Sequence, residues 1–316
     1  MKSNQLLPSN NIAGFHIEPT NICTLKCPGC ARTQFIQQWP THWKNHSIDI
    51  DQLLNFLDCD LNNKKITLCG NTGDPIYHPD FHRLVRELKQ RGSLINLVTN
   101  GSYKKQDWWQ ELTQYLNEQD TVVFSIDGLP ENFTQYRINA DWESIQVGIE
   151  TVVASRAQTC WKYIPFLYNQ DNIEQAKALS ESLGVDEFIV VPSDRFDQHT
   201  DHYRPTRVDL FGQRLESQTL WKQQSQIATV NPACGNNREH YISADGFYSP
   251  CCYLADFRFY YKTQFGKNKK AYNIKDTTIS AIIAAQAQVE FFANLDQQPG
   301  CQFNCPNTNE KSNNLN

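Results

Sequence analysis

The chain has 316 residues, and its 29 Lys and Arg against 34 Asp and Glu give a formal net charge of −5. This length suits one large α/β domain with an appendage, and the mild acidity argues against a general nucleic-acid binder. The sequence contains no run of 18 apolar residues that would predict a membrane span. Its first residues lead into no apolar segment typical of a secretory signal, so we expect a cytoplasmic protein without a membrane partner.

The cysteine content points to metal ligation. Eleven cysteines are too few for a disulfide scaffold of this length. Their odd number and their tight local groups indicate metal binding in a reducing compartment.

Up to Pro192 the chain alternates short apolar segments, typical of strands, with amphipathic segments typical of helices. Gly92 and Gly184 supply helix ends. We predict strands at residues 15–18, 65–69, 94–99, 121–126, 162–168 and 187–191, and helices at 79–88 and 171–183. In the helix at 79–88 the buried face is expected to contain Phe81, Leu84, Val85 and Leu88. Six strand–helix units predict a parallel α/β sheet, open or partly closed into a (β/α)6 barrel, since a full barrel needs eight.

The rest of the chain loses this alternation. We predict a polar loop at 193–206, a hairpin of residues 240–243 and 247–249, and a helix at 277–295 with Ile279, Ile282, Ile283 and Val289 inward. Residues 307–316 are polar and expected to be disordered. The predicted organisation is an N-terminal extension at 1–13, a core domain at 14–192, a linker and small C-terminal domain at 193–306, and a tail at 307–316.

The strongest motif is Cys23-Thr24-Leu25-Lys26-Cys27-Pro28-Gly29-Cys30, on the loop after the first predicted strand. Three thiolates cannot close a tetrahedral zinc site or saturate a [4Fe–4S] cube, so one iron would stay open for an exogenous ligand. The alternative is a zinc loop whose fourth ligand lies elsewhere, for example at His16 or His42.

This CxxxCxxC loop, preceded by Ile17-Glu18-Pro19-Thr20-Asn21, resembles the radical S-adenosylmethionine (radical SAM) enzymes. The resemblance implies a [4Fe–4S] cluster on Cys23, Cys27 and Cys30 whose open iron binds the amino and carboxylate groups of SAM. It also implies reductive cleavage of SAM to a 5′-deoxyadenosyl radical, which removes hydrogen from a substrate C–H bond. An electron donor of the flavodoxin or ferredoxin type is implied as a partner.

The resemblance extends to further strand ends. Thr72-Gly73-Asp74-Pro75 is similar to the GGEP segment that holds the SAM amino group in this family, although Thr72 and Asp74 replace a glycine and a glutamate. Polar residues at the carboxyl ends of parallel strands form ligand sites in α/β sheets. The cofactor-binding residues implied in this way are Thr72, Gly73, Asp74, Asn100, Ser125, Asp127, Asn169, Gln170 and Val191.

A second cysteine group follows in the C-terminal part. Cys234, eleven residues, Gly246, four residues and Cys251 resemble the opening of the SPASM and twitch extensions of radical SAM enzymes, and Cys301 and Cys305 would close the site. The resemblance implies one auxiliary [4Fe–4S] cluster on Cys234, Cys251, Cys301 and Cys305, with the Gly-X4-Cys spacing selecting Cys251 over Cys252. Four thiolates leave no open iron, which favours electron transfer. The alternative is a four-cysteine zinc site.

Catalytic side chains are harder to identify. Tyr136 and Arg137 follow the fourth strand and are candidates because a guanidinium can clamp a carboxylate. His199 and His202 are candidates for a general base. Cys59, Cys69 and Cys160 lie in apolar segments and are expected to be buried packing residues.

Together these features predict a radical SAM enzyme with a partial (β/α)6 barrel and a twitch-like C-terminal domain. It would act on a peptide or a small molecule, with the auxiliary cluster accepting an electron from the substrate. Two alternatives remain open: a non-catalytic zinc-binding interaction protein, and a radical SAM enzyme whose second cluster is only structural.

Overall fold

The computed structural model describes residues 12–193, 196, 199–210, 230, 239–255 and 260–305. The chain divides into two units. The larger contains residues 17–47 and 61–212, and the smaller contains residues 1–16, 48–60 and 213–316. Cys234 and the tail at 307–316 lie outside the described residues, as does part of the loop predicted at 193–206.

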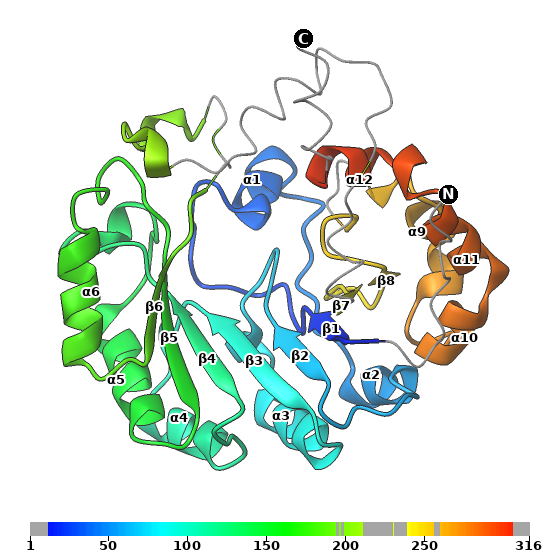
Figure 1. The fold of residues 1–316 in the computed structure, drawn as a ribbon, viewed down its shortest axis with the longest axis horizontal. Coiled ribbons are helices and arrows are strands. Elements are labelled where there is room, and N and C mark those ends of the chain that lie inside the picture. Colours follow the sequence, from blue (N-terminus) through cyan, green and yellow to red (C-terminus); the bar gives the residue numbers. More distant parts are fainter. Residues whose placement is uncertain are drawn as a thin grey trace, which may run out of the picture. The chain divides into compact units, whose positions relative to one another are not determined.

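The larger unit is built on a sheet with the strand order β6-β5-β4-β3-β2, and Ile17, the last residue of β1, belongs to the same unit (Figure 1). Neighbouring strands from β2 to β6 pair in parallel. The strands are β1 (Gly14–Ile17), β2 (Lys65–Leu68), β3 (Leu94–Thr99), β4 (Thr121–Ser125), β5 (Gln158–Tyr163) and β6 (Glu187–Val190). Each lies at or near its predicted place except β5, which begins and ends earlier than the predicted 162–168. The turn after it is held closed because the Asn169 side chain accepts from the Phe166 N–H at 2.5 Å and donates to the Ile164 carbonyl at 3.1 Å.

Helices follow the strands, and α3 to α6 line the outer side of this sheet, whereas α1 lies apart from that layer (Figure 1). They are α1 (Ala31–Gln38), α3 (Phe81–Gln90), α4 (Gln106–Thr113), α5 (Trp142–Val153) and α6 (Ile173–Ser182). Short 3-10 turns lie between them: η2 (Pro75–Tyr77), η3 (Phe133–Gln135), η4 (Asp201–Tyr203) and η5 (Val208–Leu210). The predicted buried face of α3 is confirmed, and the chain leaves α3 and α6 through glycines with φ of +79° and +80°, Gly92 and Gly184.

The two faces of the sheet differ in burial. Phe124 and Trp161 point to the helices, where their rings lie 5.5 Å from Trp109 and 5.9 Å from Trp142, and both are fully buried. Side chains alternate along a strand, so Ser125 and Lys162 point to the opposite side. We call this opposite side the inner face; it also bears Asn96, Val98 and Ile189, which are half-buried or exposed.

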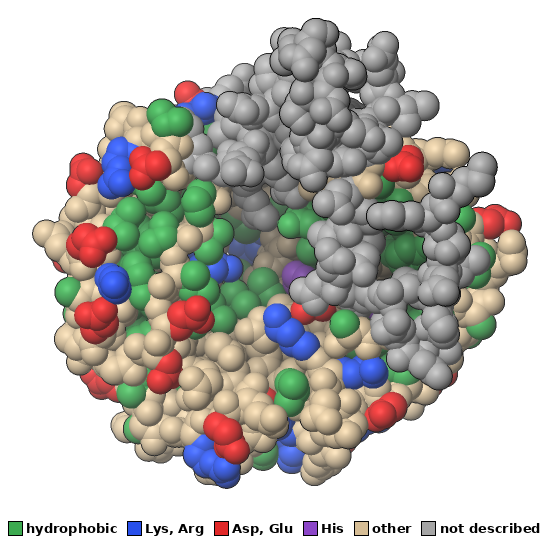
Figure 2. All heavy atoms as spheres, in the orientation of Figure 1, with side chains coloured by type: hydrophobic (Ala, Val, Ile, Leu, Met, Phe, Trp, Pro, Cys, Tyr) green, Lys and Arg blue, Asp and Glu red, His purple; other side chains and the backbone are tan. Residues whose placement is uncertain are grey.

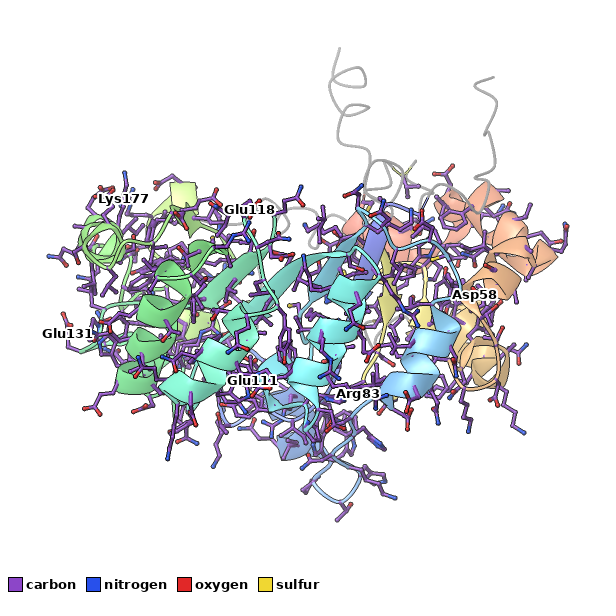
Figure 3. The ribbon with its side chains drawn as sticks, turned by 90° about the horizontal axis from the view of Figure 1, so that it is seen from below. Asp58, Arg83, Glu111, Glu118, Glu131 and Lys177 are labelled. Atoms are coloured by element: carbon purple, nitrogen blue, oxygen red, sulfur yellow. The ribbon has the colours of Figure 1, made fainter. Side chains whose placement is uncertain are left out.

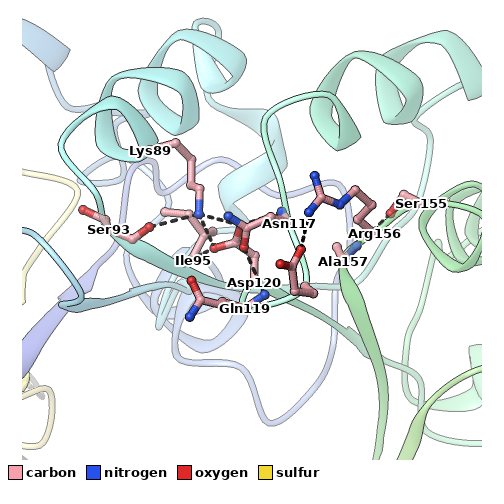
Figure 4. A network of polar contacts seen from close by, with 10 residues as sticks. Lys89, Ser93, Ile95, Asn117, Gln119, Asp120, Ser155, Arg156 and Ala157 are labelled. Atoms are coloured by element: carbon pink, nitrogen blue, oxygen red, sulfur yellow. Dashed lines mark hydrogen bonds and ion pairs between the residues drawn. The ribbon is translucent and has the colours of Figure 1, made fainter.

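A buried acid ties the amino ends of two strands to α3 (Figure 4). The Asp120 carboxylate is fully buried and lies 2.7 Å from Lys89 Nζ. It also accepts from the backbone N–H groups of Ile95 and Asn117, at 2.7 and 2.8 Å. These contacts stand at the end of the sheet opposite to the strand ends that form the candidate site, so they support the scaffold.

The smaller unit contains the strand order β1-β7-β8, with β7 (Glu239–Ile242) antiparallel to β8 (Tyr248–Ser249). The predicted hairpin is thus present, with Gly246 at φ +75° in its turn. Its helices are α2 (Ile50–Phe56), α9 (Gln264–Lys267), α10 (Ile279–Ala284), α11 (Gln286–Ala293) and α12 (Pro299–Asn304), with 3-10 turns η7 (Lys269–Tyr272) and η8 (Leu295–Gln297). In the described part of the chain, none of the helices combines the length and the hydrophobicity that a bilayer crossing requires.

The single helix predicted at 277–295 is wrong. Ala285 adopts an extended conformation, with φ −71° and ψ 137°, and separates α10 from α11. The reason is a change of buried face: α10 buries Ile279 and Ile282, whereas α11 buries Gln288 and Phe291, which are out of phase with them. The predicted inward positions Ile283 and Val289 are only half-buried.

Candidate functional site

The loop that carries Cys23, Cys27 and Cys30 follows β1 directly and belongs to the larger unit. Its start is fixed by the Asn21 N–H, which donates to the His46 carbonyl at 3.0 Å. Its middle is fixed by the Lys26 N–H, which donates to the Ile138 carbonyl at 3.0 Å. All three cysteines are of intermediate exposure, so each thiol is partly accessible.

The thiols lie close enough to influence one another. Burial, followed by the negative charge of Asp74, raises the pKa of Cys23 to about 12, and Cys27 and Cys30 add to this effect. Burial raises the pKa of Cys27 to about 11, although the positive charge of Arg137 acts in the opposite direction. Burial and neighbouring negative charges disfavour the thiolate forms of these cysteines. A bound metal ion would favour the thiolates, because its positive charge offsets both effects.

These donors fit the iron–sulfur cluster that the sequence predicts. Cys23 Sγ accepts hydrogen bonds from the Leu25 N–H at 3.4 Å and from Asn100 Nδ2 at 3.7 Å, and N–H donors to sulfur stabilise a bound thiolate. No three His, Cys, Asp or Glu side chains of the described residues are arranged to enclose a single metal ion.

Arg137 and Asp127 form a largely buried ion pair beside this loop. Arg137 Nε lies 2.6 Å from Asp127 Oδ2, and the other carboxylate oxygen accepts from the Ile164 N–H at 2.9 Å. The pair therefore places a positive charge near Cys27, as the effect on the Cys27 pKa also shows.

Asp74 lies at the carboxyl end of the strands, as predicted, but its carboxylate accepts hydrogen bonds from other residues of the chain. It accepts from Thr99 Oγ1 at 2.8 Å, from the Asn100 N–H at 2.6 Å and from the Asn100 side chain, and it is 5% exposed. Burial raises its pKa despite these hydrogen bonds. Asp74 therefore orients Asn100, which in turn contacts Cys23.

Glu18 is a site residue that the sequence analysis missed. Its Oε1 accepts from the Thr72 N–H, the Thr72 hydroxyl and the Gly73 N–H, at 2.6, 2.8 and 3.0 Å. The signal in the sequence was an acidic residue at the carboxyl end of a buried strand. A Cβ on Gly73 would come within 2.0 Å of the Thr20 carbonyl oxygen, so Gly73 is required by the close approach of two loops of the chain itself.

The remaining predicted cofactor residues differ in whether their side chains already form hydrogen bonds within the chain. Asn169 is fully buried, and its amide donates to the Asp127 and Ile164 carbonyls. Gln170 holds the loop at 206–207, because its Oε1 accepts from the Thr206 N–H at 2.9 Å. Ser125 and Val191 lie at strand ends, with Val191 37% exposed, and their contact to a cofactor stays a prediction.

Of the four catalytic candidates, the structure brings Tyr136, Arg137 and His202 towards the same end of the larger unit. The Tyr136 ring stacks on Phe166 at 4.0 Å and meets Tyr203 edge-on at 5.3 Å. The His202 ring lies 4.1 Å from that of Tyr203. Arg137 is engaged by Asp127, and His199 lies in a turn next to Thr200.

The C-terminal cysteines belong to the smaller unit. Cys301 is buried in α12 and Cys305 ends that helix, with the Cys305 N–H donating to the Cys301 carbonyl at 2.7 Å. Cys251 and Cys252 follow β8 and are half-buried. Of the three predicted packing cysteines, Cys160 is buried, whereas Cys59 and Cys69 are half-buried.

Two family models match the chain. Residues 17–183 match the model of the radical SAM superfamily, and residues 234–306 match that of the SPASM iron–sulfur cluster-binding domain. A curated relative, the tungsten-containing aldehyde ferredoxin oxidoreductase cofactor-modifying protein of Pyrococcus furiosus, is 27% identical over 199 residues. That match covers 55% of this chain and 50% of the relative, so it spans half of the relative's length.

Solved structures show the same fold. SuiB of Streptococcus suis bound to its precursor peptide SuiA has a TM-score of 0.57 at 12% identity, covering 90% of this chain and 66% of SuiB. SuiB bound to S-adenosylmethionine has a TM-score of 0.55 at 14% identity, covering 86% of this chain and 68% of SuiB. anSMEcpe with bound AdoMet and Cp18Cys peptide has a TM-score of 0.58 at 14% identity, covering 90% and 83%. The resemblance and the fold class predicted from the sequence are thereby confirmed.

Proposed function

Because this chain belongs to the radical SAM superfamily, we propose that it cleaves SAM reductively and modifies a substrate by removing hydrogen from a C–H bond. SAM and a [4Fe–4S] cluster are the cofactors of that superfamily, and the SPASM match adds auxiliary iron–sulfur binding. When bound, the N-terminal cluster supplies the one electron that breaks a carbon–sulfur bond of SAM. The single observation that carries the proposal is the group of three mutually interacting thiols on one anchored loop.

The residues of this chain have distinct tasks in the proposal. Cys23, Cys27 and Cys30 hold the cluster. Asn100, fixed by Asp74, donates to Cys23, and Arg137, fixed by Asp127, provides a compensating positive charge near Cys27. We expect the backbone at 72–74, which Glu18 orders, to bind the amino group of SAM.

A peptide or protein-bound group is the substrate class that we favour over a free small molecule. SuiB and anSMEcpe, which share the fold, each have structures with a bound peptide. The Pyrococcus furiosus relative, described as a cofactor-modifying protein, supports the wider class of modification enzymes. Since the reaction consumes an electron, a flavodoxin or ferredoxin is the partner that we propose, in the reducing environment of the cytoplasm.

Alanine variants of the N-terminal cysteines test the proposal. Cys23→Ala, Cys27→Ala or Cys30→Ala should abolish formation of 5′-deoxyadenosine from SAM under dithionite, while about half of the iron stays in the C-terminal domain. Cys59→Ala is the matched control, because Cys59 is a half-buried cysteine outside both groups. Undiminished 5′-deoxyadenosine formation in any of the three variants would contradict the assignment.

The auxiliary cluster needs a separate test. We propose that Cys234, Cys251, Cys301 and Cys305 bind it and that it accepts an electron from the substrate. A variant with Cys251, Cys301 and Cys305 replaced by Ala should still cleave SAM but form no oxidised product. A thermal melt must accompany the assay, because cluster binding also contributes folding free energy. A folded variant that gives full product would leave the cluster a structural role, and two zinc ions in colourless protein would support the zinc alternative.

A further inference from the structure

One side of the cysteine loop is exposed and adjoins two turns of the larger unit. The Ile138 carbonyl accepts from the Lys26 N–H at 3.0 Å, and the Asn139 side chain donates to the Thr24 carbonyl at 3.4 Å. The Tyr103 hydroxyl in turn donates to the Asn139 carbonyl at 2.7 Å. We call the surface formed by these five residues the cysteine-loop surface. It includes the part of the loop that lies between the first two cysteines in the chain.

Tyr103 is the strained residue of this surface. Its φ of +65° lies in the left-handed region, which bulky residues rarely adopt, and its side chain is 52% exposed. Such a conformation costs about 1–3 kcal/mol, and a ring that stays half in water recovers little of this by burial. The turn is held by hydrogen bonds to Ser144 and Asn139. The fold thus keeps an aromatic ring at the surface, near Ile138, which is 38% exposed.

The segments that contribute to this surface carry positive charge only. Residues 19–48, 99–106 and 132–140 contain no Asp or Glu, although the whole chain has a net charge of −5. The first acids beyond two of these segments, Asp107 and Asp141, accept from backbone N–H groups near the starts of α4 and α5. On the face drawn in Figure 2, by contrast, acidic and basic side chains are interspersed. The cysteine-loop surface should therefore attract an acidic partner.

Two further lysines beside Tyr103 add to the charge of Lys26. Lys105 is exposed, as is Lys26 itself. Lys104 is half-buried, with its Nζ 5.3 Å from the centroid of the Tyr77 ring and 4.8 Å from that of Trp108. None of the three lysines forms an ion pair with a residue that the structure describes. Their charges are therefore available to a partner.

We propose that the cysteine-loop surface docks a flavodoxin, which donates electrons to the N-terminal cluster. The inference rests on the proposed function, because only a reaction that consumes electrons needs a donor. Electron transfer between proteins requires close approach, and Thr24 and Lys26 each adjoin a cluster ligand in the chain. The exposed side chains of Tyr103 and Ile138 match the apolar edge of a flavin, and the lysines match an acidic rim around it. In this step the anionic reduced flavin loses one electron and no proton, and the cluster gains that electron.

Tyr103→Gly tests the aromatic contact without unfolding the turn. Glycine adopts a φ of +65° without strain, so a thermal melt should show no loss of stability. Calorimetric titration of the anaerobically reconstituted protein with a bacterial flavodoxin should show an affinity about tenfold lower than that of the wild type. Tyr103→Phe keeps the ring and should bind like the wild type. Reduction by dithionite should be unchanged in both variants, because a small reductant needs no docking surface.

Lys104→Met tests the charge. Methionine removes the ammonium and keeps an unbranched apolar side chain against Tyr77 and Trp108. Flavodoxin should associate about threefold more slowly at low ionic strength and with a weaker salt dependence. Lys177→Met is the control, because Lys177 lies on the outer side of α6 (Figure 3), where it is 53% exposed. Stopped-flow absorbance then follows electron transfer from reduced flavodoxin, which should slow in Lys104→Met but not in the control.

The double variant with Tyr103→Gly and Lys104→Met decides the proposal. The proposal is overturned if this variant, shown to be folded by circular dichroism, binds flavodoxin and accepts its electron like the wild type. A wild-type protein that binds a ferredoxin but no flavodoxin would overturn the choice of partner. If the wild type binds flavodoxin and the double variant does not, but the dithionite-reduced wild type cleaves no SAM, the proposed function is contradicted and the docking surface stands.

Discussion

Arg137 Nε lies 2.6 Å from Asp127 Oδ2, and the two side chains are only 16% and 0% exposed. The pair links the end of β4 to the segment after η3, whose Ile138 carbonyl accepts from the Lys26 N–H of the cysteine loop. A buried ion pair is costly to break from one side, because the remaining charge is stranded without a partner. Removal of either charge alone should therefore destabilise the segment that supports the cysteine loop.

Arg137→Gln should lower the free energy of unfolding by about 3–5 kcal/mol, because it strands the buried Asp127 carboxylate. Asp127→Asn combined with Arg137→Gln removes both charges and should cost less than either single change. Urea unfolding of all four proteins checks this as a double-mutant cycle. Additive effects would show that the two charges do not depend on each other.

The same double variant should also make the N-terminal cluster harder to reduce. The double variant removes both charges, but Arg137 affects Cys27 more strongly than the opposing Asp127 does. The net effect should therefore move the midpoint potential to more negative values, by on the order of tens of mV. An electron-spin resonance titration of the reconstituted protein measures this shift. Arg156→Gln combined with Glu118→Gln is the control, because that exposed pair lies at the opposite end of the strands (Figure 4). An unchanged potential would mean that Arg137 only supports the loop.

Asp74 should make stability depend on pH in a characteristic direction. Burial raises its pKa above 3.8, the ordinary value, and hydrogen bonds from Asn100 and Thr99 only partly offset this. An acid with a raised pKa in the folded state contributes most below the unfolded pKa, and the contribution is lost as pH rises through the folded pKa. Wild-type stability should therefore contain a component that declines as pH rises above 3.8, and Asp74→Asn should lack it.

Asp74→Asn should also cost about 1–3 kcal/mol, because an amide nitrogen would face the Asn100 N–H. Asp80→Asn is the matched control, since Asp80 is exposed and makes no side-chain cap to α3. Thermal melts from acid to neutral pH measure both effects. Parallel pH profiles for the wild type and Asp74→Asn would contradict the assignment.

Glu18 should be needed for SAM binding, because it orders the backbone at 72–74. Glu18→Ala leaves the half-buried donors of Thr72 and Gly73 without their acceptor, at a cost of about 1–3 kcal/mol, and should weaken SAM binding. Glu18→Gln keeps one acceptor oxygen and should behave more like the wild type. Equilibrium dialysis with SAM measures the effect, with the exposed Glu131→Ala as control (Figure 3). Wild-type affinity in a folded Glu18→Ala protein would remove Glu18 from the site.

Asp58 should stabilise the smaller unit only while it is ionised. Burial raises its pKa, but hydrogen bonds from the Ser280 N–H, at 3.0 Å, and from Thr278 outweigh this and lower it overall. A lowered pKa means that the contribution is present above the unfolded pKa and is lost as pH falls through the folded pKa. Asp58→Asn (Figure 3) should therefore lower the melting temperature at pH 7 and have little effect below about pH 3. An equal loss at both values would mean that charge plays no part.

The local patterns of the sequence sufficed for the strand–helix alternation and the cysteine loop. Strand positions follow from short apolar segments, and the buried face of α3 follows from the spacing of Phe81, Leu84, Val85 and Leu88. The group of Cys23, Cys27 and Cys30 can be recognised in the sequence because its three members lie within eight residues. These features depend on neighbours in the chain, which is why the sequence determined them.

Contacts between distant segments were decided only by the tertiary structure. Lys162 follows Ser125 by 37 residues, and their adjacency depends on the register of two strands. Glu18 meets Thr72 because β1 and β2 lie side by side, and Asp74 meets Asn100 because β3 ends beside η2. The break at Ala285 likewise depends on which face of α11 is buried against Tyr248 and Phe265. Whether a polar group is free for a ligand or already used within the chain follows from these long-range contacts, and no local pattern encodes them.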